Sequence, residues 1–221
     1  QILKFVYYTE MKEAKMQVAK KAYIEIQNDI SADTVLGIGT GSTVDCFIDI
    51  LGKERPRLKG AVSSSERSTN LLRSIGIKVY DLNDVTEINY YIDGADEVDG
   101  KNFLIKGGGG AMTREKIVAA ASNIFICIVD SSKIVSGLGG FGIPIEVLSE
   151  SLNYVTQEIK KLGGNPILRD GFITDSGNQI IDIKDINIAD PLELEKTLNS
   201  IPGVVENGIF AQQRPNLVLV D

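Results

Sequence analysis

Three segments of this sequence combine residue types and spacings that suit chemistry on an anionic substrate. The first is the run GIGTGST at residues 37–43, which follows an apolar segment. Glycines let the backbone approach an anion, and a helix that starts here offers free amide groups and the positive end of its dipole. Ser42 stands where the dinucleotide fingerprint needs its third glycine, and the Gly-Lys ending of a P-loop is missing. The run therefore predicts a phosphate cradle, with a ligand-free capped turn as the alternative.

The second segment is the acidic run DGADEVD at residues 93–99, directly after the apolar pair Tyr91 and Ile92. It holds four carboxylates in seven residues. Open α/β sheets bind their ligands at the carboxyl ends of the strands, so acids placed here suit a binding crevice. A turn with solvated acids is the competing interpretation. A calcium-binding loop is a weaker interpretation, because the spacing of the acidic residues does not follow the twelve-residue pattern with its terminal glutamate.

The third segment is KGGGGAMTREK at residues 106–116. Four consecutive glycines lose much conformational entropy on folding, which favours a backbone that must come close to a ligand. Lys106 can stabilise a negative oxygen. Glu115 falls in the first turn of a predicted helix, where it can complement the helix dipole or act as a general base, and these residues alone do not favour the base. Ser63–Ser65 and Asp130–Lys133 also fall at strand ends, and each favours a turn when taken singly.

The composition narrows the chemistry that these segments can perform. The chain of 221 residues contains no histidine. This removes Ser-His and Cys-His nucleophiles and His-ligated metals, and it leaves Asp, Glu, Lys or Tyr for proton transfer. We therefore expect neither a metal nor a cofactor. Two cysteines, Cys46 and Cys127, lie among apolar residues and are interpreted as buried free thiols rather than as a disulfide.

The net charge and the hydropathy of the chain limit the classes of partner that it can bind. The net charge of −7 argues against binding to nucleic acid, which requires a basic face. A small anionic metabolite stays possible, because a few local donors outweigh a mildly acidic surface. No apolar run approaches the ~20 residues of a membrane span, and the start lacks the features of a signal peptide. We expect a cytoplasmic protein that does not bind membranes.

Alternating strand and helix patterns up to about residue 140 predict an α/β fold with a largely parallel sheet. The predicted strands are 34–38, 60–62, 77–80, 89–92, 103–105 and 124–129, and the predicted helices are 10–27, 43–51, 65–74 and 114–121. On helix 10–27, apolar residues recur on one face with lysines opposite. Residues 217–220 are predicted to return to this sheet as its last strand.

Beyond residue 140 the order changes to strand, helix, strands, helix, strand, which is typical of a small α+β domain of split-βαβ type. The predicted strands are 144–148, 167–169, 172–174, 179–183 and 204–210, and the predicted helices are 150–162 and 191–201, the second capped by Asp190. The expected division is therefore a main domain at 11–140 with 211–221 returning to it, and a smaller α+β domain at 141–210.

Together, these motifs resemble the type A ribose-5-phosphate isomerase family in order and spacing, over roughly residues 13–221. The matching motifs are GTGST at 39–43, SSS at 63–65, DGADE at 93–97, KGGGGA at 106–111, REK at 114–116, Asp130-x-Ser132-Lys133 and IPGVV at 201–205. Met112 stands where the family usually has leucine, a volume-conserving change of little consequence. Residues 1–10 match nothing in the family.

The resemblance implies a Rossmann-like main domain with a largely parallel sheet, a smaller ferredoxin-like α+β lid domain, and a homodimer or homotetramer. It implies that Glu115 is the general base and that Asp93, Asp96 and Lys106 handle the sugar hydroxyls and the enediolate. The substrate-binding residues that it implies are Lys15, Thr40, Gly41, Ser42, Thr43, Gly107, Gly108 and Lys133.

The expected activity is the interconversion of D-ribose 5-phosphate and D-ribulose 5-phosphate through an enediolate, a step of the non-oxidative pentose phosphate pathway. Two other classes stay open. One is a sensor that binds a sugar phosphate without turnover, and the other is a different enzyme of the same fold, such as an amino-sugar-phosphate deaminase or a coenzyme A transferase. The block from Lys106 to Glu115 favours the isomerase, and either Asp93 or Asp96 can move the ring-opening proton.

Overall fold

The computed structural model describes the backbone of residues 2–221 and the side chains of residues 11–221. The chain divides into two compact units, which are described separately. The first comprises Gln1–Gly94, Val118–Lys133 and Pro215–Asp221, and the second comprises Ala95–Ile117 and Ile134–Arg214. The domain boundaries expected near residues 140 and 210 stay a prediction, because division by compactness also assigns Ala95–Ile117 to the second unit.

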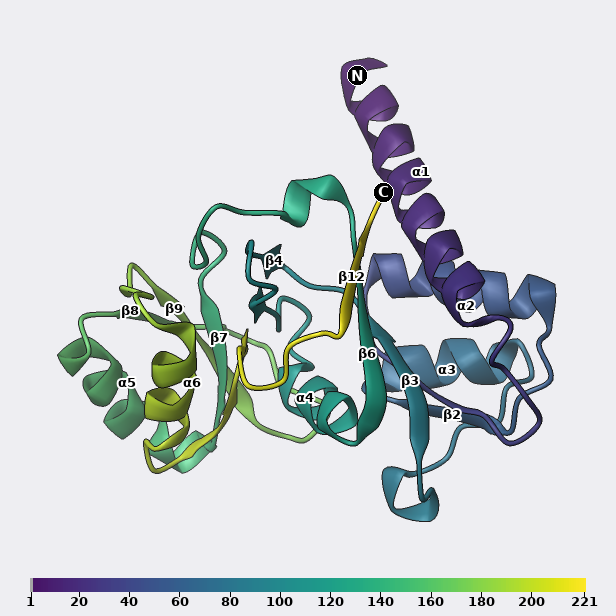
Figure 1. Cartoon of the computed structure of the whole chain (residues 1–221). Helices are drawn as coiled ribbons and strands as arrows, with labels where there is room; N and C mark the ends of the chain where they lie inside the picture. Colours follow the sequence, from purple (N-terminus) through teal and green to yellow (C-terminus); the bar gives the residue numbers. More distant parts are fainter. Residues whose placement is uncertain (1) are drawn as a thin grey trace. The chain divides into compact units, whose positions relative to one another are not determined.

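A five-stranded parallel sheet forms the centre of the first unit, with the strand order β12-β6-β3-β1-β2. Its strands are β1 (Val35–Ile38), β2 (Gly60–Ser63), β3 (Ile88–Asp93), β6 (Ser122–Val129) and β12 (Leu217–Val220). The last strand pairs with β6, as the sequence predicts (Figure 1). The largely parallel sheet expected from the alternating pattern is therefore confirmed.

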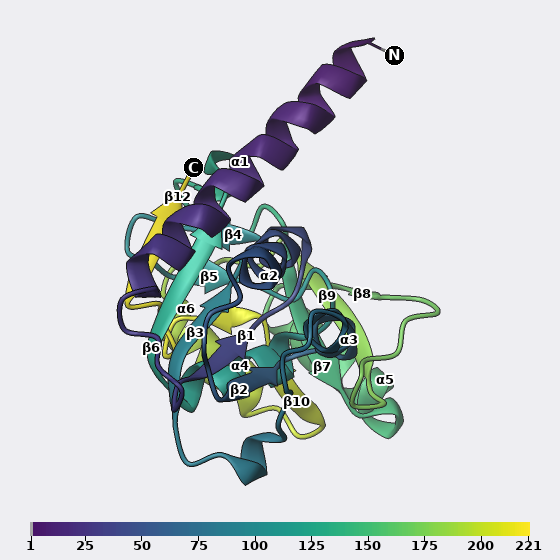
Figure 2. The ribbon, with the colours of Figure 1, turned by 90° about the vertical axis from the view of Figure 1, so that its right-hand side faces the viewer.

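Three helices cover one face of this sheet, namely α1 (Ile2–Ile26), α2 (Ser42–Glu54) and α3 (Glu66–Ser74). Seen from that side, α1 runs in front of β6 and β12 (Figure 2). Leu36 and Ile38 of β1 point toward the helices and share one buried cluster with Val18 of α1 and Phe47 of α2. Period-two alternation turns Gly37 to the opposite face. A Cβ there would lie 2.9 Å from Tyr91 and 3.0 Å from Val118, so only glycine fits that packing.

Two predictions for this unit are corrected. Helix α1 begins at Ile2 rather than at Glu10, and residues 2–9 contain no glycine or proline that would end a helix. The predicted strand at 77–80 is wrong, because the segment makes only one bridge, from Val79 to Ala61 of β2. The chain turns away directly afterwards, where the Asp81 side chain accepts a hydrogen bond from the Asn83 amide and starts a 3₁₀ turn (Leu82–Asp84).

Deleting residues 1–10 is expected to leave turnover and the melting temperature nearly unchanged. Among the side chains of α1 that the structure describes, the fully buried ones begin at Val18 and continue through Ala19, Ala22 and Ile26. Burial of apolar surface supplies most of the stabilising free energy of a helix, so we expect the described part of α1 to hold the helix in place without residues 1–10. Differential scanning calorimetry and a turnover assay on the shortened chain check this. A fall of the melting temperature by more than about 4 °C, which corresponds to about 1–2 kcal/mol, contradicts it.

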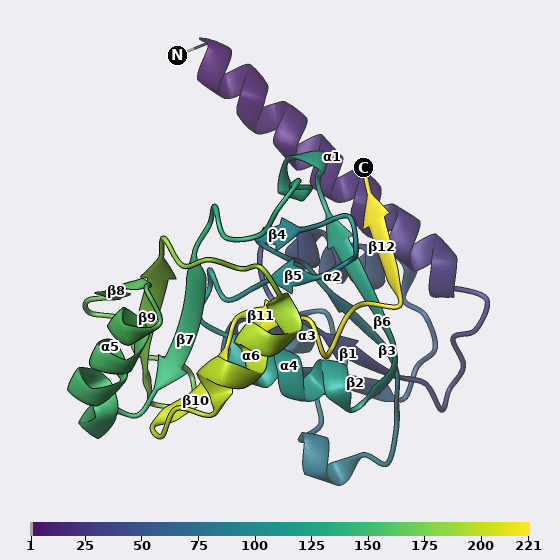
Figure 3. The ribbon, with the colours of Figure 1, turned by 60° about the vertical axis from the view of Figure 1, so that its left-hand side comes forward.

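The second unit contains a four-stranded antiparallel sheet with the order β10-β7-β9-β8. In chain order its elements are β7 (Ile143–Val147), α5 (Leu152–Lys161), β8 (Asn165–Leu168), β9 (Gln179–Lys184), α6 (Pro191–Asn199) and β10 (Val204–Asn207). This is the ferredoxin-like βαββαβ arrangement. Figure 3 shows α5 and α6 against this sheet, where Ile159 and Leu198 share one buried cluster with the isoleucines of β7 and β9. Asp190 caps α6 as predicted, accepting from the Leu192 amide at 3.0 Å.

A small three-stranded sheet, β11-β5-β4, also belongs to the second unit and was not predicted. It consists of β4 (Glu97–Val98), β5 (Leu104–Ile105) and β11 (Ile209–Phe210). The predicted strand 103–105 therefore does not join the parallel sheet. The predicted strand 204–210 divides at Gly208, where a Cβ would lie 2.2 Å from the carbonyl oxygen of Lys106. Helix α4 (Met112–Ala120) follows β5.

One further strand prediction is wrong, and the prediction of buried free thiols is confirmed. Residues 172–174 have no regular secondary structure, and a turn follows them, in which the Thr174 hydroxyl accepts from the amides of Ser176 at 3.3 Å and Asn178 at 3.1 Å. Cys46 and Cys127 are buried free thiols, and burial, together with Asp49 and Asp45, raises the pKa of the Cys46 thiol. Within residues 2–221 no helix has both the length and the apolar character that crossing a bilayer requires.

Candidate active site

The parallel sheet has a topological switch point between β1 and β3. From β1 the chain passes through α2 to β2 on one side, and β3 then joins β1 on the other side. The loops that follow these two strands leave in opposite directions and open a crevice at the carboxyl ends of the strands. The loop with Gly39 follows β1, and Asp93 is the last residue of β3. The first and second sequence motifs thus meet at the place where this fold binds ligands.

Asp93 is fully buried and held by hydrogen bonds at both carboxylate oxygens. Its Oδ1 accepts from the amides of Thr40 at 3.1 Å and Gly94 at 2.8 Å. Its Oδ2 accepts from the hydroxyl of Tyr91, two residues earlier on the same face of β3. Gly39 leaves the space that the carboxylate occupies, because a Cβ there would lie 1.9 Å from the Asp93 Cγ. These donors and this space fix the carboxylate at the crevice.

The start of α2 has the features of an anion site rather than of a capped turn. Gly41 occupies the N-cap with a φ of 106° and has no side chain to bond the first amides of the helix. Gly41 and Ser42 are exposed and Thr43 is half-buried, so the first turn faces solvent. The ammonium of Lys15 donates to the Ser42 hydroxyl at 3.0 Å. A positive charge, a hydroxyl and the helix N-terminus therefore converge, as phosphate binding requires.

The two smaller candidate segments lie at the ends of β2 and β6, two strands of the same sheet. The Ser65 hydroxyl lies 3.0 Å from the Thr40 hydroxyl and accepts from the Ser68 amide at 3.1 Å, so Ser65 also caps α3. After β6, the Asp130 side chain accepts from the Ser132 amide and closes the short turn that carries Lys133. Lys133 is half-buried there. The turns predicted at both strand ends are present, and Lys133 lies at the carboxyl end of the sheet.

In the second unit, Lys106 and Glu115 form a buried ion pair. The Lys106 ammonium lies 3.3 Å from the Glu115 carboxylate oxygen Oε2, and the two side chains are 3% and 5% exposed. Lys106 directly follows β5, and Glu115 lies in the first turn of α4. The ring of Phe210 packs beside the pair, with its centroid 5.5 Å from the Lys106 ammonium. A Glu that only complemented a helix dipole would face solvent, so this burial favours a chemical role.

The glycine run between these two residues brings backbone to Asp96. The amide of Gly108 donates to Asp96 Oδ2 at 2.8 Å, and a Cβ on Gly108 would lie 2.6 Å from Asp96 Oδ1. Gly107 has a φ of 105°, a backbone conformation that residues other than glycine rarely adopt. Arg169 donates to the carbonyls of Gly107 and Gly108 at 3.2 Å. The run is therefore an ordered loop, as its predicted role requires.

The other two acids of the second motif have structural roles. Both carboxylate oxygens of Glu97 accept from backbone amides, those of Gly139 at 2.6 Å and Phe141 at 2.5 Å. Asp99 accepts from the amides of Lys101 and Phe103, as the turn interpretation predicts. Sequence reasoning missed Tyr91, Arg169 and Phe210. Only Tyr91 had a signal, its period-two spacing from Asp93 on one strand.

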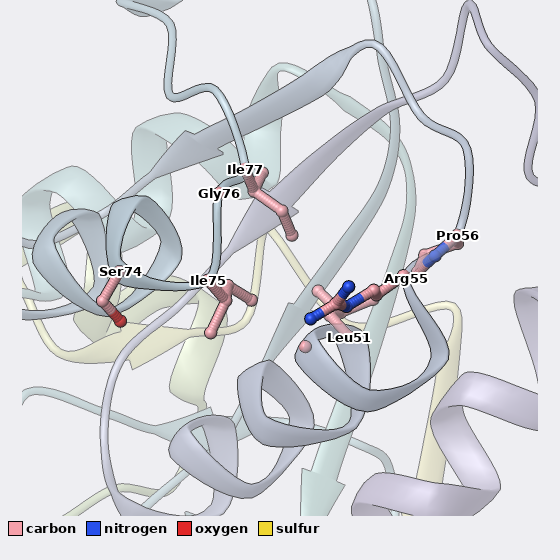
Figure 4. Close-up of a pocket in the computed structure, with 8 residues that line it drawn as sticks. Leu51, Arg55, Pro56, Ser74, Ile75, Gly76 and Ile77 are labelled. Atoms are coloured by element: carbon pink, nitrogen blue, oxygen red, sulfur yellow. The ribbon is translucent and has the colours of Figure 1, made fainter.

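A separate hollow of about 560 Å³ lies in the first unit, at the C-terminal ends of α2 and α3 (Figure 4). Both helices start near the carboxyl ends of the strands, so this hollow belongs to the opposite edge of the sheet. Its lining residues are Leu51, Gly52, Arg55, Pro56, Ser74, Ile75, Gly76 and Ile77. None of the candidate residues belongs to this set, so this hollow does not coincide with the candidate chemistry.

A parallel sheet with an exposed, glycine-rich helix start, together with a ferredoxin-like unit and a buried Lys–Glu pair, is the arrangement of an α/β enzyme suited to an anionic substrate. Comparison with known proteins identifies the family. The family model of ribose 5-phosphate isomerase A (phosphoriboisomerase A) matches residues 60–221. The structure of ribose 5-phosphate isomerase A from Neisseria gonorrhoeae is 44% identical, with a TM-score of 0.90 over 95% of this chain and 92% of that one.

Two more solved structures extend the match. The ribose 5-phosphate isomerase A of Methanocaldococcus jannaschii is 40% identical, with a TM-score of 0.86 over 94% of both chains. A D-ribose-5-phosphate isomerase in complex with phospho-erythronic acid is 38% identical, with a TM-score of 0.88 over 95% of both chains. The chain belongs to the family of type A ribose 5-phosphate isomerases.

Proposed function

We propose that this chain interconverts D-ribose 5-phosphate and D-ribulose 5-phosphate through an enediolate, with Glu115 as the base. The observation that carries the proposal is the buried contact between the Lys106 ammonium and the Glu115 carboxylate at 3.3 Å. Family membership supports the substrate. The test is a turnover assay with ribose 5-phosphate that detects ribulose 5-phosphate. Binding without turnover would favour the sensor class instead.

The reaction needs a base that faces two neighbouring carbons. Glu115 takes the proton from C2 of the open-chain aldose, and the electrons form the enediolate while the O1 carbonyl becomes an alkoxide. The same carboxyl then returns that proton to C1, while the hydroxyl proton of O2 passes to the O1 alkoxide, so that C2 becomes the ketone and C1 carries the hydroxyl. Lys106 lies beside this carboxylate and supplies positive charge for the growing negative charge on oxygen. The amide of Gly107 adds a donor, while the amide of Gly108 holds Asp96 in place.

The aspartates act on the sugar hydroxyls. Asp93 is fixed at the end of β3, and Asp96 is half-buried beside Gly108. Either carboxylate can carry the proton that moves when the furanose ring opens. Base, electrophile and hydrogen-bond donors are thus all supplied by side chains and backbone, so the proposed chemistry needs neither a metal nor a nicotinamide cofactor.

The start of α2 binds the phosphate in this proposal. Thr40, Gly41, Ser42 and Thr43 offer amides and hydroxyls, and the charges of Lys15 and Lys133 complement the phosphate. Binding energy gathered at the phosphate, remote from the reacting carbons, orients C1 and C2 at the base.

Unphosphorylated ribose is therefore expected to have a kcat/KM at least about 1,000-fold below that of ribose 5-phosphate, since three or more charge-assisted hydrogen bonds of about 1.5–3 kcal/mol each are lost. Steady-state kinetics with both sugars check this. Comparable kcat/KM values for the two sugars would show that the loop at residues 39–43 is only a structural turn.

The biological setting is part of the same proposal. We expect a cytoplasmic homodimer or homotetramer that acts in the non-oxidative pentose phosphate pathway, with residues 141–210 serving as the lid or oligomerisation domain. The family supports a sugar-phosphate substrate. Light scattering coupled to size-exclusion chromatography tests the oligomeric state, and a mass of about 24 kDa for a single chain contradicts it.

A further inference from the structure

A second buried lysine lies next to the proposed base, and the mechanism above does not use it. Lys116 follows Glu115 on α4 and is 7% exposed. Its ammonium donates to four acceptors at 2.7–2.8 Å, which are Glu195 Oε1, Glu206 Oε1 and the carbonyl oxygens of Asn207 and Ile209. An ammonium has three hydrogens, so every donor of Lys116 is engaged.

Glu195 extends this contact to the chain that follows β11. The residue lies on α6 and is fully buried. While its Oε1 accepts from Lys116, its Oε2 accepts from the backbone amides of Ala211 at 3.0 Å and Gln212 at 2.8 Å. One carboxylate therefore joins three elements, namely α4, α6 and the segment after β11.

The strand that Lys116 contacts, β11, pairs with β5, the strand that directly precedes Lys106. In this pairing Ile209 lies opposite Ile105, and the amide of Lys106 donates to the Gly208 carbonyl at 2.8 Å. The two lysine ammonium groups share the ring of Phe210, whose centroid lies 5.5 Å from Lys106 and 4.9 Å from Lys116. Lys116 thus ties the helix that bears Glu115 to the strand pair that bears Lys106.

We propose that Lys116 and Glu195 form a positioning pair that holds the Glu115 carboxylate against the Lys106 ammonium; this rests on the proposed role of Glu115 as base. Consecutive residues on a helix point about 100° apart. Fixing the side chain of Lys116 therefore fixes the rotation of the first turn of α4, and with it the direction of Glu115. Buried ion pairs contribute little to net stability, so stability alone is a weak reason for this cluster.

The test compares Lys116→Met and Glu195→Gln with Glu193→Gln. Glu193 lies two residues from Glu195 on α6, and its ion pair with Lys196 is exposed to solvent, so its loss should change nothing. Both cluster variants should lose about 10- to 100-fold in kcat, since a misplacement of about 1 Å costs up to about 100-fold. KM for ribose 5-phosphate should stay within about threefold, because the phosphate site is unchanged.

Calorimetric titration with phospho-erythronic acid counts the folded binding sites, and kcat is expressed per site. Lys116→Met leaves the buried Glu195 and the half-buried Glu206 without their cation and should lower the melting temperature. The double variant Lys116→Met/Glu195→Gln removes one charge of each sign, so its melting temperature should recover while its kcat per site stays low. Recovery of kcat together with the melting temperature would show a purely structural role and overturn the proposal.

If Lys116→Met does not fold, Glu195→Gln and the double variant decide the question. A shift of about 1 Å should cost far more than about threefold in rate. A kcat per site within about threefold of wild type in both variants therefore overturns the proposal. A failure of the proposed function would give a different experimental result from a failure of the positioning role. It appears as a wild-type chain without turnover, or as a Glu115→Gln variant with unchanged kcat, and either result removes this inference as well. Loss of kcat in Glu115→Gln but not in the cluster variants overturns the positioning role alone.

Discussion

Glu115→Gln is expected to lower kcat by at least about 100-fold, while the variant folds normally and changes KM far less. Loss of a general base typically reduces the rate by about 10²–10⁴-fold. The amide keeps the shape of the carboxylate and can still accept from the Lys106 ammonium, which lies 3.3 Å from Oε2 in the unaltered chain. Steady-state kinetics with ribose 5-phosphate, supported by calorimetric binding of phospho-erythronic acid, measure the effect.

Glu66→Gln is the matched control for this variant. Glu66 also lies in the first turn of a helix, α3, but it is exposed. A glutamate that only complements the helix dipole contributes at most about 1 kcal/mol to stability, and its loss leaves turnover intact. Loss of the general base should remove about 99% of the wild-type kcat. If Glu115→Gln instead behaves like Glu66→Gln and keeps more than about a tenth of that kcat, Glu115 is not the base. Asp93 or Asp96 is then the candidate.

The second large effect is expected for Gly39→Ala, which should reduce kcat/KM by about 100-fold or more, the loss typical of a misplaced catalytic group. A Cβ at residue 39 would lie 1.9 Å from both the Cγ and the Oδ1 of Asp93, far inside van der Waals contact. The backbone cannot move away easily, because the Ser68 hydroxyl donates to the Gly39 carbonyl at 2.7 Å. The carboxylate must therefore leave the amide of Thr40.

Gly100→Ala is the control, because a Cβ at Gly100 would meet no atom within 4 Å. Thermal unfolding of both variants separates misplacement of Asp93 from general loss of structure. A Gly39→Ala variant whose kcat/KM stays within about threefold of wild type would show that the position of Asp93 does not matter for turnover, since misplaced catalytic groups usually cost far more.

Local patterns predicted much of the fold. Apolar runs of four to eight residues marked the parallel strands, and the pair Asp190 and Pro191 marked the start of α6. Where the local signal was ambiguous, the predictions failed. Residues 77–80 were predicted as a strand but make one bridge, and residues 172–174 are irregular and lead into a turn held by the Thr174 side chain. In both places a side-chain hydrogen bond nearby favours a turn over a ladder.

The sequence by itself determined the class of this protein. The absence of histidine, the glycine run at 37–43 and the block at 106–116 all depend on residue type and short spacing, which is what a linear pattern carries. These signals predicted an anion site at a helix start and the resemblance to the isomerase family, and the alternation of strand and helix patterns predicted the parallel sheet. Their physical basis is local, since backbone freedom, capping and the helix dipole act within a few residues.

Only the tertiary structure decided which of the polar residues are placed for chemistry. Asp93 and Glu97 have the same charge and lie four residues apart, yet Asp93 occupies the switch point of the sheet while Glu97 binds the amides of a loop. Lys116 looks like a surface lysine in the sequence and is buried against Glu195. These assignments depend on pairings such as β5 with β11, which join residues 104–105 to residues 209–210. Contacts at such separation are set by packing of the whole unit, and no local pattern encodes them.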